Sequence, residues 1–134
     1  MATKDNFFQT SDGLWLYYEV TGEGRPIVLI PGFGEALTMW KYAVPVLSQR
    51  FQVVCLDPRG HGRSMKAAGN NRQKRMAQDI RELIDHLGLE DVLLVGHSLG
   101  GAIVATKLFL RLFLTSVVSV TASTLLAAVG LYKI

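Results

Sequence analysis

Residues 92–101 of the chain are Val-Leu-Leu-Val-Gly-His-Ser-Leu-Gly-Gly. The first four are apolar and predict a short buried strand, and the residues after Ser98 predict a helix over 99–112. Gly96 and Gly100 lie two positions before and after Ser98, so neighbouring backbone segments can approach without meeting a Cβ atom. A serine on such a sharp strand-to-helix turn presents its hydroxyl above the edge of a sheet, where it can act as a nucleophile.

Strands and helices alternate in the rest of the predicted secondary structure. The predicted strands lie at 26–30, 51–56 and 115–121, with a hairpin over 6–20 around a turn at 11–13. The predicted helices are 35–49, which Pro45 interrupts, and 72–87, which is amphipathic. Strands separated by helices indicate βαβ units, so the chain is predicted to be an α/β protein with a parallel sheet covered on both faces.

The composition excludes several classes of protein. The 134 residues are 49% hydrophobic and 19% charged, which excludes an intrinsically disordered chain. One cysteine, Cys55, excludes a disulfide framework, and three histidines beside it argue against a zinc cluster. Residues 1–97 carry 11 basic and 11 acidic side chains, whereas residues 98–134 carry three basic and no acidic ones. The net charge of +3 is therefore not a basic patch, and we expect no nucleic-acid partner.

Three motifs together resemble the α/β-hydrolase superfamily, in its small esterase, lactonase and haloperoxidase-like branch. Residues 30–34 (Ile-Pro-Gly-Phe-Gly) are similar to the oxyanion loop, residues 57–64 (Asp-Pro-Arg-Gly-His-Gly-Arg-Ser) to the loop after the fourth strand, and residues 96–101 to the nucleophile elbow. The resemblance runs from about Phe7 to about Ala122. It implies a partial α/β-hydrolase fold, with a mostly parallel sheet flanked by helices and truncated after about the sixth strand. Residues 1–134 would then form a single incomplete core domain.

The resemblance also implies the residues of an active site. Ser98 matches the nucleophile, and the backbone N–H groups of Leu99 and Phe33 match the oxyanion hole. The elbow glycines are Gly96, Gly100 and Gly101. The family more often has His where Pro31 stands, but its donor comes from the Phe33 position, so the hole can survive. The implied reaction is acyl transfer from a small ester-like substrate to water, with no metal and no organic cofactor.

Other residues of these motifs are expected to be structural. We expect the His97 ring to point away from the serine, and His61 to support the site rather than act in catalysis. Asp57 and Arg59 are expected to hold their own loop together by hydrogen bonds. Cys55, on a predicted strand, is expected to be a small buried hydrophobic residue.

The family's catalytic triad follows the chain order Ser, then Asp or Glu, then His. After Ser98 the sequence contains no Asp, no Glu and no His, so neither the triad acid nor the triad histidine can be assigned. A serine hydroxyl without a base is a poor nucleophile at neutral pH. The chain is therefore expected to be incomplete, or inactive by itself, and a completing fragment would have to supply the acid, the base and the cap.

The last part of the sequence allows two interpretations. Residues 112–132 form an uncharged stretch of 21 residues, long enough to cross a membrane as a helix. Six of them are Ser or Thr and several are β-branched, which favours a buried strand instead. The edge strand that would end the sheet is expected to be covered by the tail 123–134, by a second copy or by a completing fragment, or else to cause aggregation. The N-terminus has no apolar signal segment, so a cytoplasmic location is expected.

Two functions from other classes stay open beside the hydrolase. One is a non-catalytic module that binds a small apolar molecule over Ser98. The other is a membrane-tethered fragment that uses residues 112–132 as its span. A truncated gene product without a function of its own is a further possibility.

Overall fold

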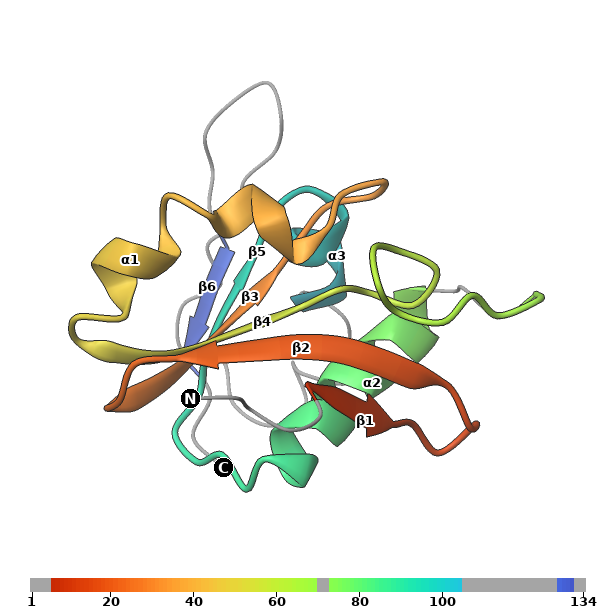
Figure 1. The fold of residues 1–134 in the computed structure, drawn as a ribbon, viewed down its shortest axis with the longest axis horizontal. Helices are drawn as coiled ribbons and strands as arrows, with labels where there is room; N and C mark the ends of the chain where they lie inside the picture. Colours follow the sequence, from red (N-terminus) through yellow and green to blue (C-terminus); the bar gives the residue numbers. More distant parts are fainter. Residues whose placement is uncertain (1–5, 70–72, 105–127, 132–134) are drawn as a thin grey trace.

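The computed structural model describes residues 6–69, 73–104 and 128–131. Within these ranges the chain forms one sheet with helices on both faces (Figure 1). The strands are β1 (Phe7–Gln9), β2 (Trp15–Thr21), β3 (Arg25–Ile30), β4 (Phe51–Leu56), β5 (Leu93–Gly96) and β6 (Ala128–Leu131). The helices are the 3₁₀ turn η1 (Leu37–Trp40), α1 (Val44–Leu47), α2 (Gln73–His86) and α3 (Leu99–Val104).

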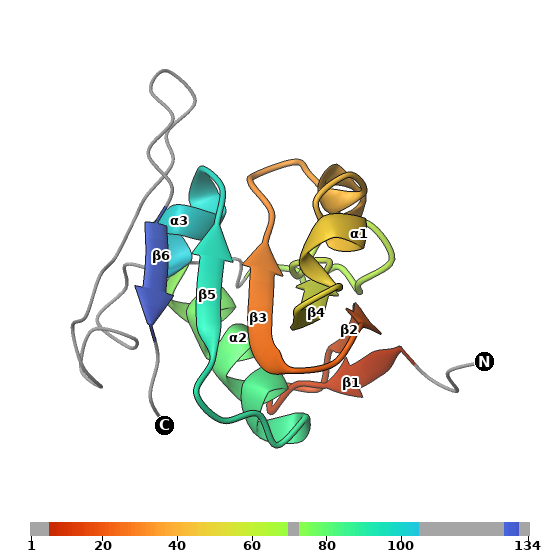
Figure 2. The ribbon, with the colours of Figure 1, turned by 90° about the vertical axis from the view of Figure 1, so that its left-hand side faces the viewer.

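The strands lie in the order β1-β2-β4-β3-β5-β6 (Figure 2). The three central strands, β4, β3 and β5, are parallel neighbours, as the alternation of strands and helices predicted. The outer strands β1, β2 and β6 each run antiparallel to their neighbour, so the sheet as a whole is mixed. The carboxyl ends of the central strands meet at one edge. The three motifs directly follow these ends, so the fold places all of them at that edge.

β6 pairs antiparallel with β5 over four residues. The predicted strand at 115–121 lies outside the described residues, as does most of the stretch 112–132. The β5 edge is instead occupied by Ala128–Leu131, from the tail that was expected to cover an edge further on. Hydrophobic patterning does not encode strand direction, which explains why the sequence could not predict this pairing. In the ranges that the structure describes, no helix is long and apolar enough to span a membrane.

Alternate residues of the central strands face two different layers. Val28 and Ile30 of β3 lie in the layer that α2 and α3 cover, whereas Ile27 and Leu29 lie in the layer of η1. The same alternation in β4 separates Val54 from Cys55. Helix α2 contributes five buried side chains to the first of these layers: Met76, Ala77, Ile80, Leu83 and Ile84. These contacts fix the central strands from both sides, as expected for parallel strands.

The helix predicted over 35–49 is divided into η1 and α1. Pro45 lies in the first turn of α1, where its missing N–H removes no intrahelical hydrogen bond. The interruption therefore falls just before the proline. The predicted helix over 72–87 is confirmed as α2, and the predicted hairpin as β1 and β2.

A buried arginine joins the hairpin to α2. Arg59, directly after β4, is fully buried and places its guanidinium 2.6 Å from Oδ2 of Asp79 in α2. The same guanidinium donates at 3.0 Å to both carboxylate oxygens of Asp12 in the hairpin turn. The Arg59 hydrogen bond holds the pKa of Asp12 well below its usual range, and a bond from Thr10 adds to this. The expectation that Arg59 acts through hydrogen bonds is confirmed, and its partners lie beyond its own loop.

Candidate active site

Ser98 occupies the turn between β5 and α3. Its φ is +53°, in the left-handed region that a residue with a side chain rarely adopts, and its side chain is exposed. Such a conformation costs free energy and persists only where the surrounding structure imposes it. The predicted sharp strand-to-helix turn is therefore present. Among the described residues, no hydrogen bond to the Ser98 hydroxyl is found.

Two glycines allow this turn to form. A Cβ atom added to Gly96 would overlap the backbone of Gly100, and one added to Gly100 would overlap the carbonyl oxygen of Ile30. The beginning of α3 is thereby held against the end of β3. The N–H of His97 also donates to the Ile30 carbonyl, at 3.0 Å. The turn at 96–101 and the loop that follows β3 are thus in direct contact.

Residues 31–36 form a loop after β3, called here the 31–36 loop. Hydrogen bonds from its backbone N–H groups fix its conformation. The N–H of Gly32 donates to the Glu35 carboxylate at 3.1 Å, and the N–H of Glu35 returns to the Gly32 carbonyl at 3.2 Å. The N–H of Gly34 donates to Nε2 of His61 at 2.9 Å. The N–H of Phe33 makes no hydrogen bond within the described part of the chain, although both of its neighbours are bound. A backbone N–H group without an internal partner is suited to bind an oxyanion.

Leu99 provides a second N–H group of this kind. It is the first residue of α3, so its N–H has no partner inside the helix. No other acceptor for it is found among residues 6–69, 73–104 and 128–131. Leu99 and Phe33 both line a cavity of about 570 Å³, and the Phe33 side chain is 80% exposed at it. The structure thus brings the two expected oxyanion donors to one cavity, while Ser98 is not among the residues that line it.

The loop over residues 57–64, called here the 57–64 loop, supports the 31–36 loop from the other side of the cavity. The Asp57 carboxylate accepts the N–H of Leu37 at 2.7 Å and the N–H of Arg63 at 2.9 Å. It also fills the space that a Cβ atom on Gly62 would need, which explains the glycine there. Asp57 holds its own loop, as predicted, and also fixes the beginning of η1.

Glu35 was not anticipated from the sequence. Its carboxylate lies 3.3 Å from Nδ1 of His97, besides accepting the Gly32 N–H. A Cβ atom on Gly32 would come 2.9 Å from that carboxylate and 3.3 Å from the His97 ring. The His97 ring is therefore turned toward the 31–36 loop. No pattern in the sequence distinguishes Glu35 from an ordinary surface carboxylate.

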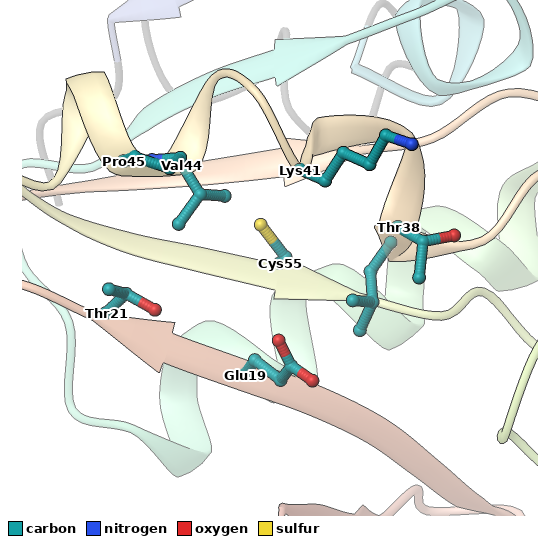
Figure 3. Close-up of a pocket in the computed structure, with 8 residues that line it drawn as sticks. Glu19, Thr21, Thr38, Lys41, Val44, Pro45 and Cys55 are labelled. Atoms are coloured by element: carbon teal, nitrogen blue, oxygen red, sulfur yellow. The ribbon is translucent and has the colours of Figure 1, made fainter.

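A second cavity, of about 230 Å³, lies on the face of the sheet that η1 and α1 cover, between these helices and strands β2 and β4 (Figure 3). Cys55 points into it from β4, with Glu19 on β2 and Lys41 after η1 at its sides. Burial, together with the Glu19 carboxylate, raises the pKa of the Cys55 thiol to about 12. Cys55 is buried, as predicted. No residue of the turn at 96–101 lines this cavity.

Neither a metal cluster nor a triad is found in the part of the chain that the structure describes. No group of three or more His, Cys, Asp or Glu side chains is arranged there to hold a metal ion. The three histidines all have other contacts: His61 with Gly34, His97 with Glu35, and His86 with the ring of Phe8. Among the described residues, the candidate site therefore consists of Ser98 and the backbone N–H groups of Leu99 and Phe33.

Comparison with known proteins gives the same family as the motifs. The family model for the alpha/beta hydrolase fold matches residues 25–122. The soluble epoxide hydrolase of Corynebacterium sp. (strain C12) is 36% identical over 92 residues, which are 69% of this chain and 32% of that protein. The non-heme haloperoxidase of Rhodococcus erythropolis is 39% identical over 100 residues, which are 74% of this chain and 36% of that protein.

Solved structures agree with these relatives. A hydrolase from Pseudomonas aeruginosa PA01 superposes with a TM-score of 0.73 at 34% identity, over 77% of this chain and 40% of that one. An esterase from Exiguobacterium antarcticum gives 0.72 at 35% identity, over 75% and 38%. The chain spans about a third of the length of the curated relatives it matches. On the matched residues, the motifs and the shared fold, the chain belongs to the alpha/beta hydrolase fold family.

Proposed function

We propose that this chain carries the nucleophile and the oxyanion-binding groups of a serine hydrolase that cleaves carboxylic esters or related acyl compounds. One observation carries the proposal. An exposed serine in a left-handed turn is followed directly by Leu99, which shares a cavity with Phe33. The N–H groups of Leu99 and Phe33 have no partner among the described residues. The epoxide hydrolase and the hydrolase among the similar proteins support a hydrolase, and the similar esterase supports ester cleavage.

The chemistry follows from these groups. The Ser98 oxygen attacks the carbonyl carbon of the substrate, and its proton passes to a base. The carbonyl oxygen becomes an oxyanion, which accepts the N–H groups of Leu99 and Phe33. The alcohol then leaves with a proton, and water hydrolyses the acyl-serine to release the acid and regenerate the serine. The exposed Phe33 ring at the cavity offers an apolar contact to the acyl group.

The base is the component that this chain does not provide in the family's order. No Asp, Glu or His follows Ser98 in the sequence. We infer that a further polypeptide segment supplies the acid and the histidine, whether it is continuous with this chain or a separate partner. Without a triad, an oxyanion hole and binding alone still leave about 10³–10⁴-fold acceleration over water. The chain by itself is therefore expected to acylate slowly and without efficient turnover.

The experiment is covalent labelling of the purified chain with a fluorophosphonate, followed by mass mapping of its peptides. We expect slow labelling at Ser98 and none at that peptide in Ser98→Ala. A chain that labels no faster than Ser98→Ala contradicts the proposal. Addition of a C-terminal fragment from a hydrolase of this family is expected to accelerate the reaction, since it supplies the base.

A second function is favoured by the absence of any base contacting Ser98 in the described residues, together with a cavity of about 570 Å³. The chain would then bind a small apolar molecule without reacting with it. Ser98→Ala distinguishes the two functions. The variant keeps the affinity for a non-reactive ester analogue in both, but it loses fluorophosphonate labelling only if the serine is a nucleophile.

A further inference from the structure

We propose that His61 is a positioning residue for the Phe33 N–H, and that it acts as a neutral imidazole with its proton on Nδ1. This inference rests on the proposed role of Phe33 as an oxyanion donor. His61 lies in the 57–64 loop, at the cavity that it shares with Phe33 and Leu99. Nothing in the proposed reaction uses the ring as an acid or a base.

The hydrogen bonds of the ring define its tautomer. Nδ1 lies 2.9 Å from the carbonyl oxygen of Arg59, and Nε2 lies 2.9 Å from the backbone N of Gly34. A carbonyl oxygen can only accept, so Nδ1 carries the proton. A backbone N–H can only donate, so Nε2 must be the unprotonated acceptor. In a ring with protons on both nitrogens, the Nε2–H would face the Gly34 N–H, and two donors cannot form a hydrogen bond.

The 57–64 loop fixes the position of the His61 ring through the bond from Nδ1 to the Arg59 carbonyl. The Arg59 side chain is fully buried and bonded to Asp79 and Asp12, which holds the carbonyl that His61 donates to. The loop also turns back to bond the Asp57 carboxylate through the Arg63 N–H. The position of Nε2 is therefore fixed. Its hydrogen bond from the Gly34 N–H in turn fixes the position of the 31–36 loop.

The effect on Phe33 follows from its neighbours. The peptide between Phe33 and Gly34 is oriented by the Gly34 N–H bond to His61, and the Gly34 φ of +75° lies in the left-handed region that favours glycine. The Phe33 side chain cannot hold the loop, because it is 80% exposed. Its ring meets the His61 ring edge-on, at 5.7 Å between centroids, which adds one contact on the same side. The Phe33 N–H belongs to the preceding peptide, between Gly32 and Phe33, whose carbonyl accepts the Glu35 N–H at 3.2 Å. The two peptides meet at the Phe33 Cα, so loss of the His61 acceptor would free the Phe33–Gly34 peptide and, through this shared atom, loosen the orientation of the Phe33 N–H.

Two substitutions separate the two nitrogens of the ring. In His61→Gln the side-chain oxygen can occupy the place of Nε2 and accept the Gly34 N–H. In His61→Asn the shorter amide reaches only the place of Nδ1, so the bond to Arg59 can form but the bond to Gly34 cannot. Both variants remain polar and uncharged. They form a complementary pair, because His61→Gln retains the bond to Gly34 and His61→Asn retains the bond to Arg59.

The first readout is independent of activity. In the ¹⁵N-labelled chain, the His61 ring is expected to show a protonated Nδ1 and an unprotonated Nε2. The exchange rate of the Gly34 amide is expected to rise about fivefold or more in His61→Asn, the equivalent of one net hydrogen bond, and to stay near the wild-type rate in His61→Gln. The opposite tautomer in the wild-type ring, or unchanged Gly34 exchange in His61→Asn, would overturn the inference.

The second readout is the rate of fluorophosphonate labelling at Ser98. We expect His61→Asn to label about 10- to 100-fold more slowly than wild type, since a misplacement of about 1 Å can lower a rate by about 10²-fold. We expect His61→Gln to recover the rate. Equal unfolding midpoints of the two variants exclude a general loss of structure. Equal labelling rates with changed Gly34 exchange would contradict the positioning role. Absence of Ser98 labelling in wild type contradicts the proposed function instead, and the Gly34 readout then still decides whether the His61 bond exists.

Discussion

Gly100 lies so close to the carbonyl oxygen of Ile30 that no Cβ atom fits between them. This contact joins the first turn of α3 to the end of β3, and hence the serine turn to the 31–36 loop. The placement of Ser98 relative to the 31–36 loop therefore depends on a position that has no room for a side chain.

Gly100→Ala is expected to displace α3 from β3, since the added methyl group would overlap backbone that cannot move aside as a side chain can. We expect a loss of about 1–3 kcal/mol in the free energy of unfolding, as for an overpacked core position. Urea denaturation measures this loss. Ala102→Ser, at an exposed position of the same helix, is the control and should change the stability by less than about 0.5 kcal/mol. A Gly100→Ala chain as stable as the control would contradict the contact.

Ser98→Gly is expected to be more stable than Ser98→Ala by about 1 kcal/mol, because glycine adopts a φ of +53° without the cost that a Cβ atom imposes. Both variants remove the hydroxyl, so their difference isolates the backbone strain. Their urea midpoints, measured under the same conditions, give the comparison. If the two midpoints coincide, the turn at residue 98 is not strained.

The stability in acid is expected to depend on Asp12. Its pKa is lowered in the folded chain because Arg59 and Thr10 hydrogen-bond to its carboxylate. The stabilisation is fully present above the ordinary pKa of a free aspartate, about 3.9. It is lost as the pH falls below that value toward the lower pKa of the folded state. Asp12→Asn should therefore be less stable than wild type at pH 7. The difference between the two urea midpoints should begin to shrink only below a pH of about 4, and it should keep shrinking as the pH falls further. A constant difference between the two chains across this range would contradict the prediction.

The Cys55 thiol is expected to resist alkylation in the folded chain. Burial and the Glu19 carboxylate raise its pKa to about 12, so the reactive thiolate is scarce at pH 8. Iodoacetamide should modify the residue slowly in buffer and rapidly in urea, and intact mass reports both rates. Fast modification without urea would show that the cavity of Figure 3 admits the reagent and that Cys55 is not shielded.

Much of this arrangement is predictable from local sequence. The turn at Ser98 follows from glycines at fixed distances and an apolar run before them, because the geometry of a sharp turn restricts which residues fit. The three central strands and α2 follow from apolar periodicity. The structural role of Asp57 and Arg59 was also expected, from the motif that contains them.

The remaining features depend on contacts between distant residues. Asp12 in the hairpin turn and Asp79 in α2 are 67 positions apart (79 less 12), yet both bind Arg59. Glu35 is one of several surface carboxylates until the fold brings it to Gly32 and His97. β6 adds to the sheet in a direction that no local pattern determines. Such side-chain partners meet only in the folded chain, so a single sequence cannot predict them.

The most direct test of the central claim is the amide spectrum of the ¹⁵N-labelled chain before and after phosphonylation of Ser98. The phosphonyl oxygen stands in for the oxyanion and should accept two backbone N–H groups. We predict that the Phe33 and Leu99 amide signals move downfield and become protected from exchange, while the Gly32 and Gly34 amides, already hydrogen-bonded, change little. Phosphonylation that leaves the Phe33 and Leu99 signals in place would contradict the account.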